Sequence, residues 1–272
     1  LGKRPICQDT GIVNVFLEVG MSVQWESELS LEDMINEGVR RAYNEPDNRL
    51  RASIVDDPLF SRKNTQDNSP AVIHTKIIKG DTLEVTVAAK GGGSENKSKF
   101  TVLNPDDSLT DWVLKTIPTM GAGWCPPGMI GIGAGGTAEK AMLMAKASLM
   151  ETIDINDIKA KKNQSDIEKL RIDLFEKINA LGIGAQGLGG LTTVLDVKIN
   201  DYPTHAASLP VAMIPNCAST RHVHFSLDGT GVAELPEVDL SLYPDLEMDV
   251  SKYTKVDLNS LTQSQMDEWN IG

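Results

Sequence analysis

Apolar residues recur at helical spacing in several stretches of the chain. Ser30 and Asp33 resemble a capping box directly before the first stretch. The clearest stretch carries one stripe of Ile and Leu residues, and Gly182 follows it as a stop signal. The helices are expected over 31–44, 107–117, 137–150, where Thr137 is the cap, and 164–181.

Runs of β-branched residues predict strands between these helices. Gly80 and Asp81 separate two such runs, which indicates a hairpin. A late segment alternates His, Val, His, Phe, Ser and Leu, as an edge strand does. The strands are expected over 71–78, 83–89, 192–199, 209–214 and 222–227. Because helices and strands are interspersed, we expect a mixed α/β fold of one large domain or two lobes.

Composition narrows the function classes. The chain has 272 residues, 40% of them hydrophobic, and a formal net charge of −12. A field of that sign repels nucleic acid and anionic membranes. No apolar run reaches the ~20 residues of a membrane span, and no secretory leader is evident. We therefore expect a cytoplasmic protein with neither nucleic acid nor a membrane as partner.

Cys7, Cys125 and Cys217 are the three cysteines, and their odd number and long spacings argue against a disulfide framework. Each lies in a loop sequence dense in Gly, Pro, Asn or Asp beside an apolar run. Three buried free thiols are the plainer interpretation, since free cysteine is often buried. Three thiols in three separate turns fit convergence on one point better.

Three thiolates bind a soft metal centre. A zinc site could recruit His205, His222 or His224 as its fourth ligand. Structural zinc usually shows a close CxxC pair, which this sequence lacks. Widely separated cysteines better suit a [4Fe-4S] cluster with one open iron, which acts as a Lewis acid.

Other segments offer candidate chemistry. Gly-Gly-Gly-Ser at 91–94 and Lys97 could receive an anion, although a flexible turn explains them equally well. His205 could move protons, whereas a locally hydrogen-bonded loop histidine is the commoner case. The G-x-G-x-x-G at 131–136 has no room for the preceding strand that a dinucleotide site needs. The Gly-rich stretch 184–190 is interpreted as a tight turn near the site.

Taken together, these segments resemble the class I fumarases and their iron–sulfur hydro-lyase relatives, which include the L-tartrate dehydratase alpha subunit. The resemblance is carried in order along nearly the whole chain. Its segments are 4–11, 90–97, 125–127, 135–137, 182–190 and 205–217, with 37–43 also typical of bacterial members.

The resemblance implies a role for each of these residues. Cys7, Cys125 and Cys217 would hold the [4Fe-4S] cluster. Asp9 and His205 would be the catalytic residues. The implied substrate contacts are Gln8, Asp9, Arg51, Gly93, Asn96, Lys97 and His205, with Arg51 gripping a carboxylate.

The implied activity is the reversible dehydration of (S)-malate to fumarate. A tartrate dehydratase and a non-catalytic three-thiolate metal-binding module are the alternatives. The resemblance also implies two lobes around the cluster site, a homodimer, and a C-terminal swivelling (beta) domain or subunit that carries the catalytic base. We expect residues 1–233 to form the iron–sulfur domain and 234–272 to form an acidic, Pro-containing tail toward that missing domain, with a leading helical segment also outside this sequence.

Overall fold

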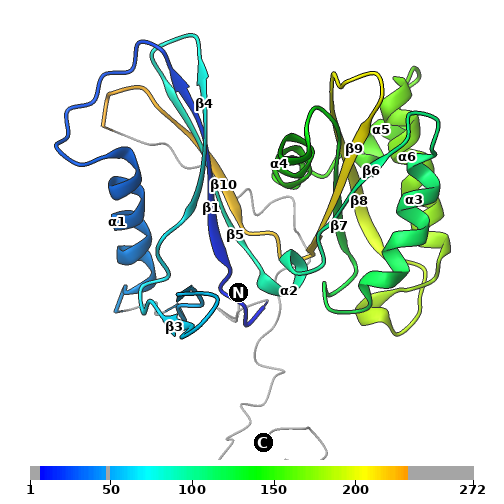
Figure 1. Cartoon of the computed structure of the whole chain (residues 1–272), viewed down its shortest axis with the longest axis horizontal. Helices are drawn as coiled ribbons and strands as arrows, with labels where there is room; N and C mark the ends of the chain where they lie inside the picture. Colours follow the sequence, from blue (N-terminus) through cyan, green and yellow to red (C-terminus); the bar gives the residue numbers. More distant parts are fainter. Residues whose placement is uncertain (1–6, 47–49, 232–272) are drawn as a thin grey trace, which may run out of the picture. The chain divides into compact units, whose positions relative to one another are not determined.

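The computed structural model describes residues 7–46 and 50–231, so the predicted tail at 234–272 lies outside the described residues. The predicted class is confirmed, because the described chain is mixed α/β with two four-stranded sheets. We call them the first sheet, in the order β10-β5-β1-β4, and the second sheet, in the order β6-β9-β7-β8 (Figure 1). Within the described ranges, no helix has the length and apolar character needed to cross a membrane.

The first sheet is built from alternating apolar residues. Along β1, Val13, Val15, Leu17 and Val19 face the core, and α1 covers this face (Figure 1). The Ser30 hydroxyl accepts from the backbone N–H of Asp33, which confirms the predicted N-cap. The bounds are β1 Ile12–Gly20, α1 Leu31–Tyr43, β4 Val72–Ile78, β5 Leu83–Lys90 and β10 His222–Leu227. β10 lies at the edge of the sheet, as predicted.

The predicted hairpin is wrong. Both strands exist, but β1 lies between them, parallel to β4 and antiparallel to β5. The connection from β4 to β5 wraps around the end of β1, where Gly20 donates to Thr82 and Met21 donates to Ile78. A Cβ at Gly20 would lie 2.5 Å from the carbonyl oxygen of Gly80, so this crossing requires glycine.

The second sheet owes its central strand to close helix packing. Gly131 and Gly133 lie inside β7, and a Cβ on either would approach a carbonyl oxygen of α4 to 2.2 Å or less. The G-x-G-x-x-G sequence therefore serves helix-on-strand contact, in agreement with the rejection of a dinucleotide site. The bounds are β6 Lys99–Leu103, β7 Gly128–Gly135, α4 Ala138–Ser148, β8 Val194–Tyr202 and β9 Leu209–Cys217.

The remaining helices complete the core of the second sheet. Ser165 and Glu168 form a full capping box at the start of α6. Gly182 follows the end of α6 at φ +67°, as the sequence predicted. These bounds are α3 Leu109–Thr116, the 3-10 turn η1 Ile117–Met120, α5 Ile155–Ala160 and α6 Asp166–Ala180. Short elements are β2 Val55–Asp56, β3 Lys63–Asn64, α2 Gly92–Glu95 and η2 Ala185–Gly187.

A third cluster of buried side chains joins the two sheets. Phe16 and Ala88 of the first sheet pack with Met129 and Ile214 of the second and with Ala145 of α4. His224 of β10 adds a polar contact at 2.9 Å to the carbonyl oxygen of Met150, just after α4. Both sheets therefore belong to one compact body.

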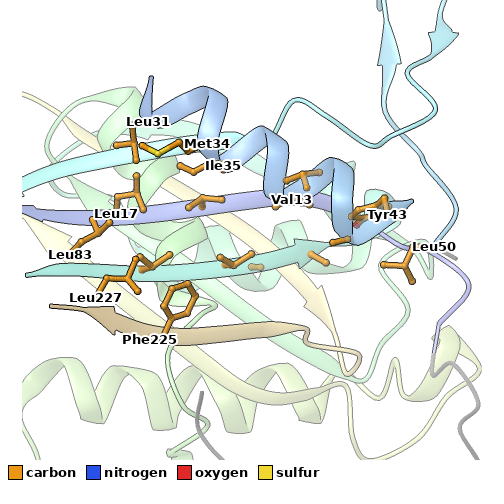
Figure 2. A pocket seen from close by; sticks show the side chains of 18 of the residues that line it. Val13, Leu17, Leu31, Met34, Ile35, Tyr43, Leu50, Leu83, Phe225 and Leu227 are labelled. Atoms are coloured by element: carbon orange, nitrogen blue, oxygen red, sulfur yellow. The ribbon is translucent and has the colours of Figure 1, made fainter. Parts of the chain in front are cut away.

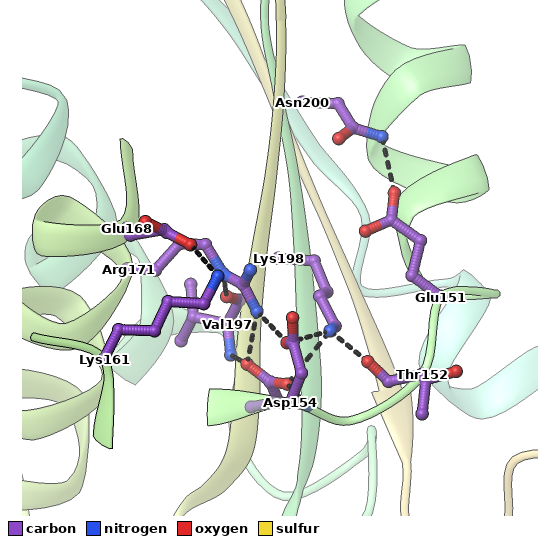
Figure 3. A network of polar contacts seen from close by, with 10 residues as sticks. Glu151, Thr152, Asp154, Lys161, Glu168, Arg171, Val197, Lys198 and Asn200 are labelled. Atoms are coloured by element: carbon purple, nitrogen blue, oxygen red, sulfur yellow. Dashed lines mark hydrogen bonds and ion pairs between the residues drawn. The ribbon is translucent and has the colours of Figure 1, made fainter. Parts of the chain in front are cut away.

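A buried charge network fastens α5 and α6 to β8 (Figure 3). Lys198 and Asp196 are almost fully buried, and their charged groups lie 3.1 Å apart. Arg171 reaches Asp154 at 2.5 Å and Asp196 at 3.1 Å, and Lys198 reaches Asp154 at 2.5 Å. Burial would raise the pKa of Asp154, but hydrogen bonds from Arg171 and Lys198 outweigh it and lower the pKa to about 2.

We expect Lys198→Met to lower the free energy of unfolding by about 3–5 kcal/mol, because two carboxylates would then share one cation. Lys177→Met removes only an exposed helix pair with Asp173 and should cost roughly 0.3–0.5 kcal/mol.

Since the folded-state pKa of Asp154 lies below its ordinary 3.8, its stabilisation is present above pH 3.8 and is lost as the pH falls toward 2. Urea denaturation at several pH values measures these effects, and equal costs for the two variants would contradict the role of the network.

Candidate functional site

Five strand ends meet at one edge of the described body. The start of β1 pairs with the end of β5 through Ile12 and Lys90, and β10 begins beside them. The start of β7 pairs with the end of β9 through Gly128 and Cys217. The short connection from Cys217 to His222 joins these two groups of ends. All three cysteines therefore lie at one edge.

Asp9 ties the Cys7 loop to the Gly-rich loop. One carboxylate oxygen accepts from the N–H of Gly11 at 2.8 Å, and the other accepts from the N–H of Gly92 at 2.7 Å. The N–H of Asp9 itself donates to the Cys7 sulfur at 3.4 Å. Gln8, between them, is exposed. The side chain of Asp9 is thus engaged in holding two loops together.

Cys125 is presented by a constrained loop. Its φ is +57°, an uncommon value for a residue with a Cβ, and the residue is exposed. The preceding Trp124 is fully buried and anchors the loop in the core. Gln186 donates from its backbone to the carbonyl of Pro126 at 2.7 Å, so the Gly-rich turn at 184–190 lies beside this loop, as expected.

The Gly-rich loop at 91–97 contacts the Cys125 loop directly. A Cβ at Gly93 would lie 2.8 Å from the carbonyl oxygen of Gly123. A Cβ at Gly123 would lie 2.7 Å from the Lys97 side chain. Asn96 is exposed at the end of the short α2 turn. The candidate substrate loop therefore borders two of the three cysteine loops.

The pKa of the Cys125 thiol is raised by its surroundings. Partial desolvation is the first cause that raises its pKa, followed by the negative charge of Cys217, Cys7 and Asp9. Charges that raise the pKa of a neighbour act over short distances, which agrees with the meeting of the three cysteine loops at this edge.

Two cations at this edge, the fully buried Lys90 and the partly buried Arg221, were not predicted from the sequence. The side chain of Lys90 is fully buried and donates to the Ser94 hydroxyl at 2.6 Å. Arg221 donates to the backbone carbonyl of Asp9, while its Nε and Nη2 are buried without a hydrogen-bond partner within the described ranges. Lys90 directly precedes Gly91 and Arg221 follows Cys217 by four residues, but no local pattern in the sequence shows their burial.

Arg51 lies next to the Cys7 loop. Its carbonyl oxygen accepts from the hydroxyl of Thr10, and its exposed side chain lines a polar cavity of about 590 Å³ with Tyr43, Asn64 and Gln66. Because the guanidinium is solvent-accessible, it can receive a carboxylate without moving the core.

His205 lies elsewhere. Gly128, at one end of β7, borders Cys217, whereas Gly135, at the other end, pairs with Tyr202, and His205 follows in the next loop. At ~3.3 Å per strand residue the two ends are roughly 20 Å apart. The exposed ring accepts at Nδ1 from the N–H of Ala207 at 3.1 Å. Within one chain, His205 is not brought to the cysteines.

A further cavity of about 500 Å³ lies between α1 and the first sheet (Figure 2). Its lining is apolar, from Leu17 and Leu83 on the sheet to Met34 on α1 and Phe225 on β10. Among the described residues that line it there is no cysteine and no charged side chain, so it is not the candidate site.

The donor set fits an iron–sulfur cluster better than a single ion. Over the residues described, no group of three or more His, Cys, Asp or Glu side chains is arranged to hold one metal ion. In a cubane cluster each cysteine binds a different iron, so its sulfurs stand further apart than those around one ion. The unpartnered N–H groups of Arg221 are suitable donors for an electron-rich sulfur group. Three cysteines beside unpaired N–H donors are chemically compatible with such a cluster.

Comparison with known proteins assigns this chain to a family of enzymes. The family model for fumarate hydratase (Fumerase) matches residues 1–226. A protein of Methanocaldococcus jannaschii provisionally named L(+)-tartrate dehydratase subunit alpha is 39% identical over 80% of this chain and 76% of its own. The L(+)-tartrate dehydratase subunit alpha of Escherichia coli K12 is 29% identical over 80% of this chain and 71% of its own.

The chain is thus a hydro-lyase by class. It belongs to the fumarate hydratase (Fumerase) family, as the resemblance indicated.

Proposed function

We propose that this chain is the cluster- and substrate-binding part of a hydro-lyase that converts (S)-malate reversibly to fumarate. The observation that supports it most is the meeting of three cysteine loops with the Asp9-held Gly-rich loop. Cys7, Cys125 and Cys217 would hold a [4Fe-4S] cluster. When bound, such a cluster supplies an open Lewis-acidic iron for the substrate hydroxyl and one carboxylate.

The chain's own residues would bind and orient the dicarboxylate. Arg51 would grip the far carboxylate through paired N–H donors from the polar cavity. Gly93 and Lys97, beside Gly123, would present backbone and ammonium groups to the same anion, with Asn96 and Gln8 as exposed amides. Holding both ends of the substrate fixes the carbon that loses its proton.

A base for that proton is proposed to come from a beta-type domain or subunit. Both carboxylate oxygens of Asp9 already accept backbone N–H groups, which favours a positioning role over proton removal. Homologues named as alpha subunits are consistent with a partner of this kind.

Tartrate is the second candidate substrate, because the relatives reported above carry that name. Malate and tartrate differ by one hydroxyl, and a site that hydrogen-bonds this hydroxyl would discriminate strongly against the analogue without it. Assay of the reconstituted enzyme with its partner on malate, fumarate and L(+)-tartrate decides between them. If the enzyme turns over none of these three diacids, the proposed function is contradicted.

Arg51→Lys is expected to lower kcat/KM for the diacid by about 10- to 100-fold while the iron content stays unchanged, because Lys cannot form the paired contact. Arg62→Lys is the matched control, since Arg62 is exposed in a neighbouring turn and its guanidinium donates to the carbonyl of Pro58. An unchanged kcat/KM in Arg51→Lys would show that Arg51 is only a surface charge.

His205 can keep its proposed substrate role only if a second copy of the chain brings it to the cysteines, which agrees with the proposed homodimer. With the beta-type partner present, we expect a Cys125→Ser chain to be inactive and a His205→Gln chain to be weakly active. Co-expressed with different tags and isolated as a mixed dimer, they should show about half the wild-type activity per dimer, because one of two symmetric sites is then intact. No recovery in the mixed dimer would remove His205 from the site.

A further inference from the structure

Lys90 is a cation that the proposed reaction does not use, yet it is almost fully buried at the end of β5. Its ammonium group lies 3.6 Å from Glu95, and Glu95 is also shared with Lys146 at 2.5 Å. Because one carboxylate is shared by two ammonium groups, this cluster carries a net positive charge. Burial lowers the pKa of Lys90 to about 8, and Cys217 is among the negative groups that oppose this shift.

Arg221 is a second cation at this edge, four residues after Cys217. Its guanidinium makes no ion pair among the described residues, and one of its N–H groups donates to the backbone carbonyl of Asp9. Two further nitrogens are buried without an acceptor in this part of the chain. Leaving such donors unpaired is costly, so an electron-rich group is expected to meet them in the working protein.

The two cations are held by different elements. The carbonyl oxygen of Arg221 accepts from the N–H of Ala89, the residue before Lys90. Lys90 itself is braced by Ser94, whose hydroxyl donates to the carbonyl of Gly91 at 3.1 Å. Lys90 is therefore hydrogen-bonded to the Gly-rich loop, and Arg221 is hydrogen-bonded to the Cys7 loop.

We propose that Lys90 and Arg221 are positioning residues that supply buried positive charge to the three-cysteine site and offset the thiolates and the anionic group these hold. This inference rests on the proposed cluster function for its second readout only. Removing positive charge near an iron–sulfur centre disfavours the added electron, so the reduction potential falls.

The first experiment reads the charge at the thiols of the full chain without a cluster. The rate of alkylation at each cysteine is measured with anionic iodoacetate and with neutral iodoacetamide, and the ratio reports the local potential. Lys90→Met and Arg221→Met should each lower this ratio about three- to tenfold at Cys217 or Cys7. Lys177→Met, on the exposed face of α6, should leave the ratio unchanged.

The second experiment uses the reconstituted chain and measures the midpoint potential of the cluster, which should shift to more negative values in both variants and not in Lys177→Met. If both variants keep the wild-type alkylation ratio, the charge role is overturned. Lys90 is the last residue of β5 and Arg221 lies in the connection before β10, so two different segments test the conclusion. If the ratios fall as expected but the wild type takes up no iron and sulfide, the charge role stands and the proposed function fails.

Discussion

Replacing Cys125 by Ser is expected to abolish retention of iron and sulfide, and with it hydro-lyase activity. Cys125 is the most exposed of the three thiols, and its positive φ is held by buried Trp124 on one side. Serine keeps this backbone but supplies no soft thiolate. The measurement is iron and sulfide content after anaerobic reconstitution, followed by turnover with the partner present.

Ala218→Ser is the matched control for this prediction. It places a hydroxyl on an exposed residue directly after Cys217 and removes no thiol. We expect wild-type iron content in this variant. Full activity in Cys125→Ser would sink the assignment of Cys125 as a ligand. Because the proposed cluster has an open iron, the wild type should also lose activity in air.

The isolated chain, even with a full cluster, is expected to be almost inactive. General base catalysis is worth ~10²–10⁴-fold, and the described site offers no base that is free to take the proton. Asp9 is engaged by Gly11 and Gly92, and His205 lies at the other end of β7. Adding the beta-type partner, in cis or in trans, should restore the rate.

Formation of fumarate from malate by the isolated, reconstituted chain checks this expectation. The Asp9→Asn variant with the partner present is the companion measurement. It should weaken the link between the two loops and lower kcat, but a positioning role should leave the pH profile of kcat unchanged. Near-enzyme rates without any partner would place the base within this chain, with Asp9 or His205 as the first suspect.

Local signals predicted much of the fold. The cap at Ser30 and the stop at Gly182 follow rules that involve only nearby residues. Strand pairing does not: no local rule says that Ile12–Gly20 inserts between β4 and β5, so the adjacent runs predicted a hairpin that the fold does not form. The glycines in Gly128–Gly135 have low strand propensity and form a strand because α4 packs against them.

The candidate site divides in the same way. Three cysteines in turn-like sequences were enough to predict convergence, because loops at strand ends meet at sheet edges. The functional interest of Lys90 and Arg221 depends on their burial, which no local pattern reveals. The separation of His205 from the cysteines depends on the pairing of β7 with β8, which is again a long-range property.

The most direct test of the central claim is the content and spectrum of the chain after anaerobic reconstitution with iron and sulfide. The account predicts a brown protein with nearly one [4Fe-4S] cluster per chain, lost in each of the single Ser variants of Cys7, Cys125 and Cys217. A colourless protein that takes up stoichiometric zinc, or a cluster that survives loss of any of these cysteines, would contradict it.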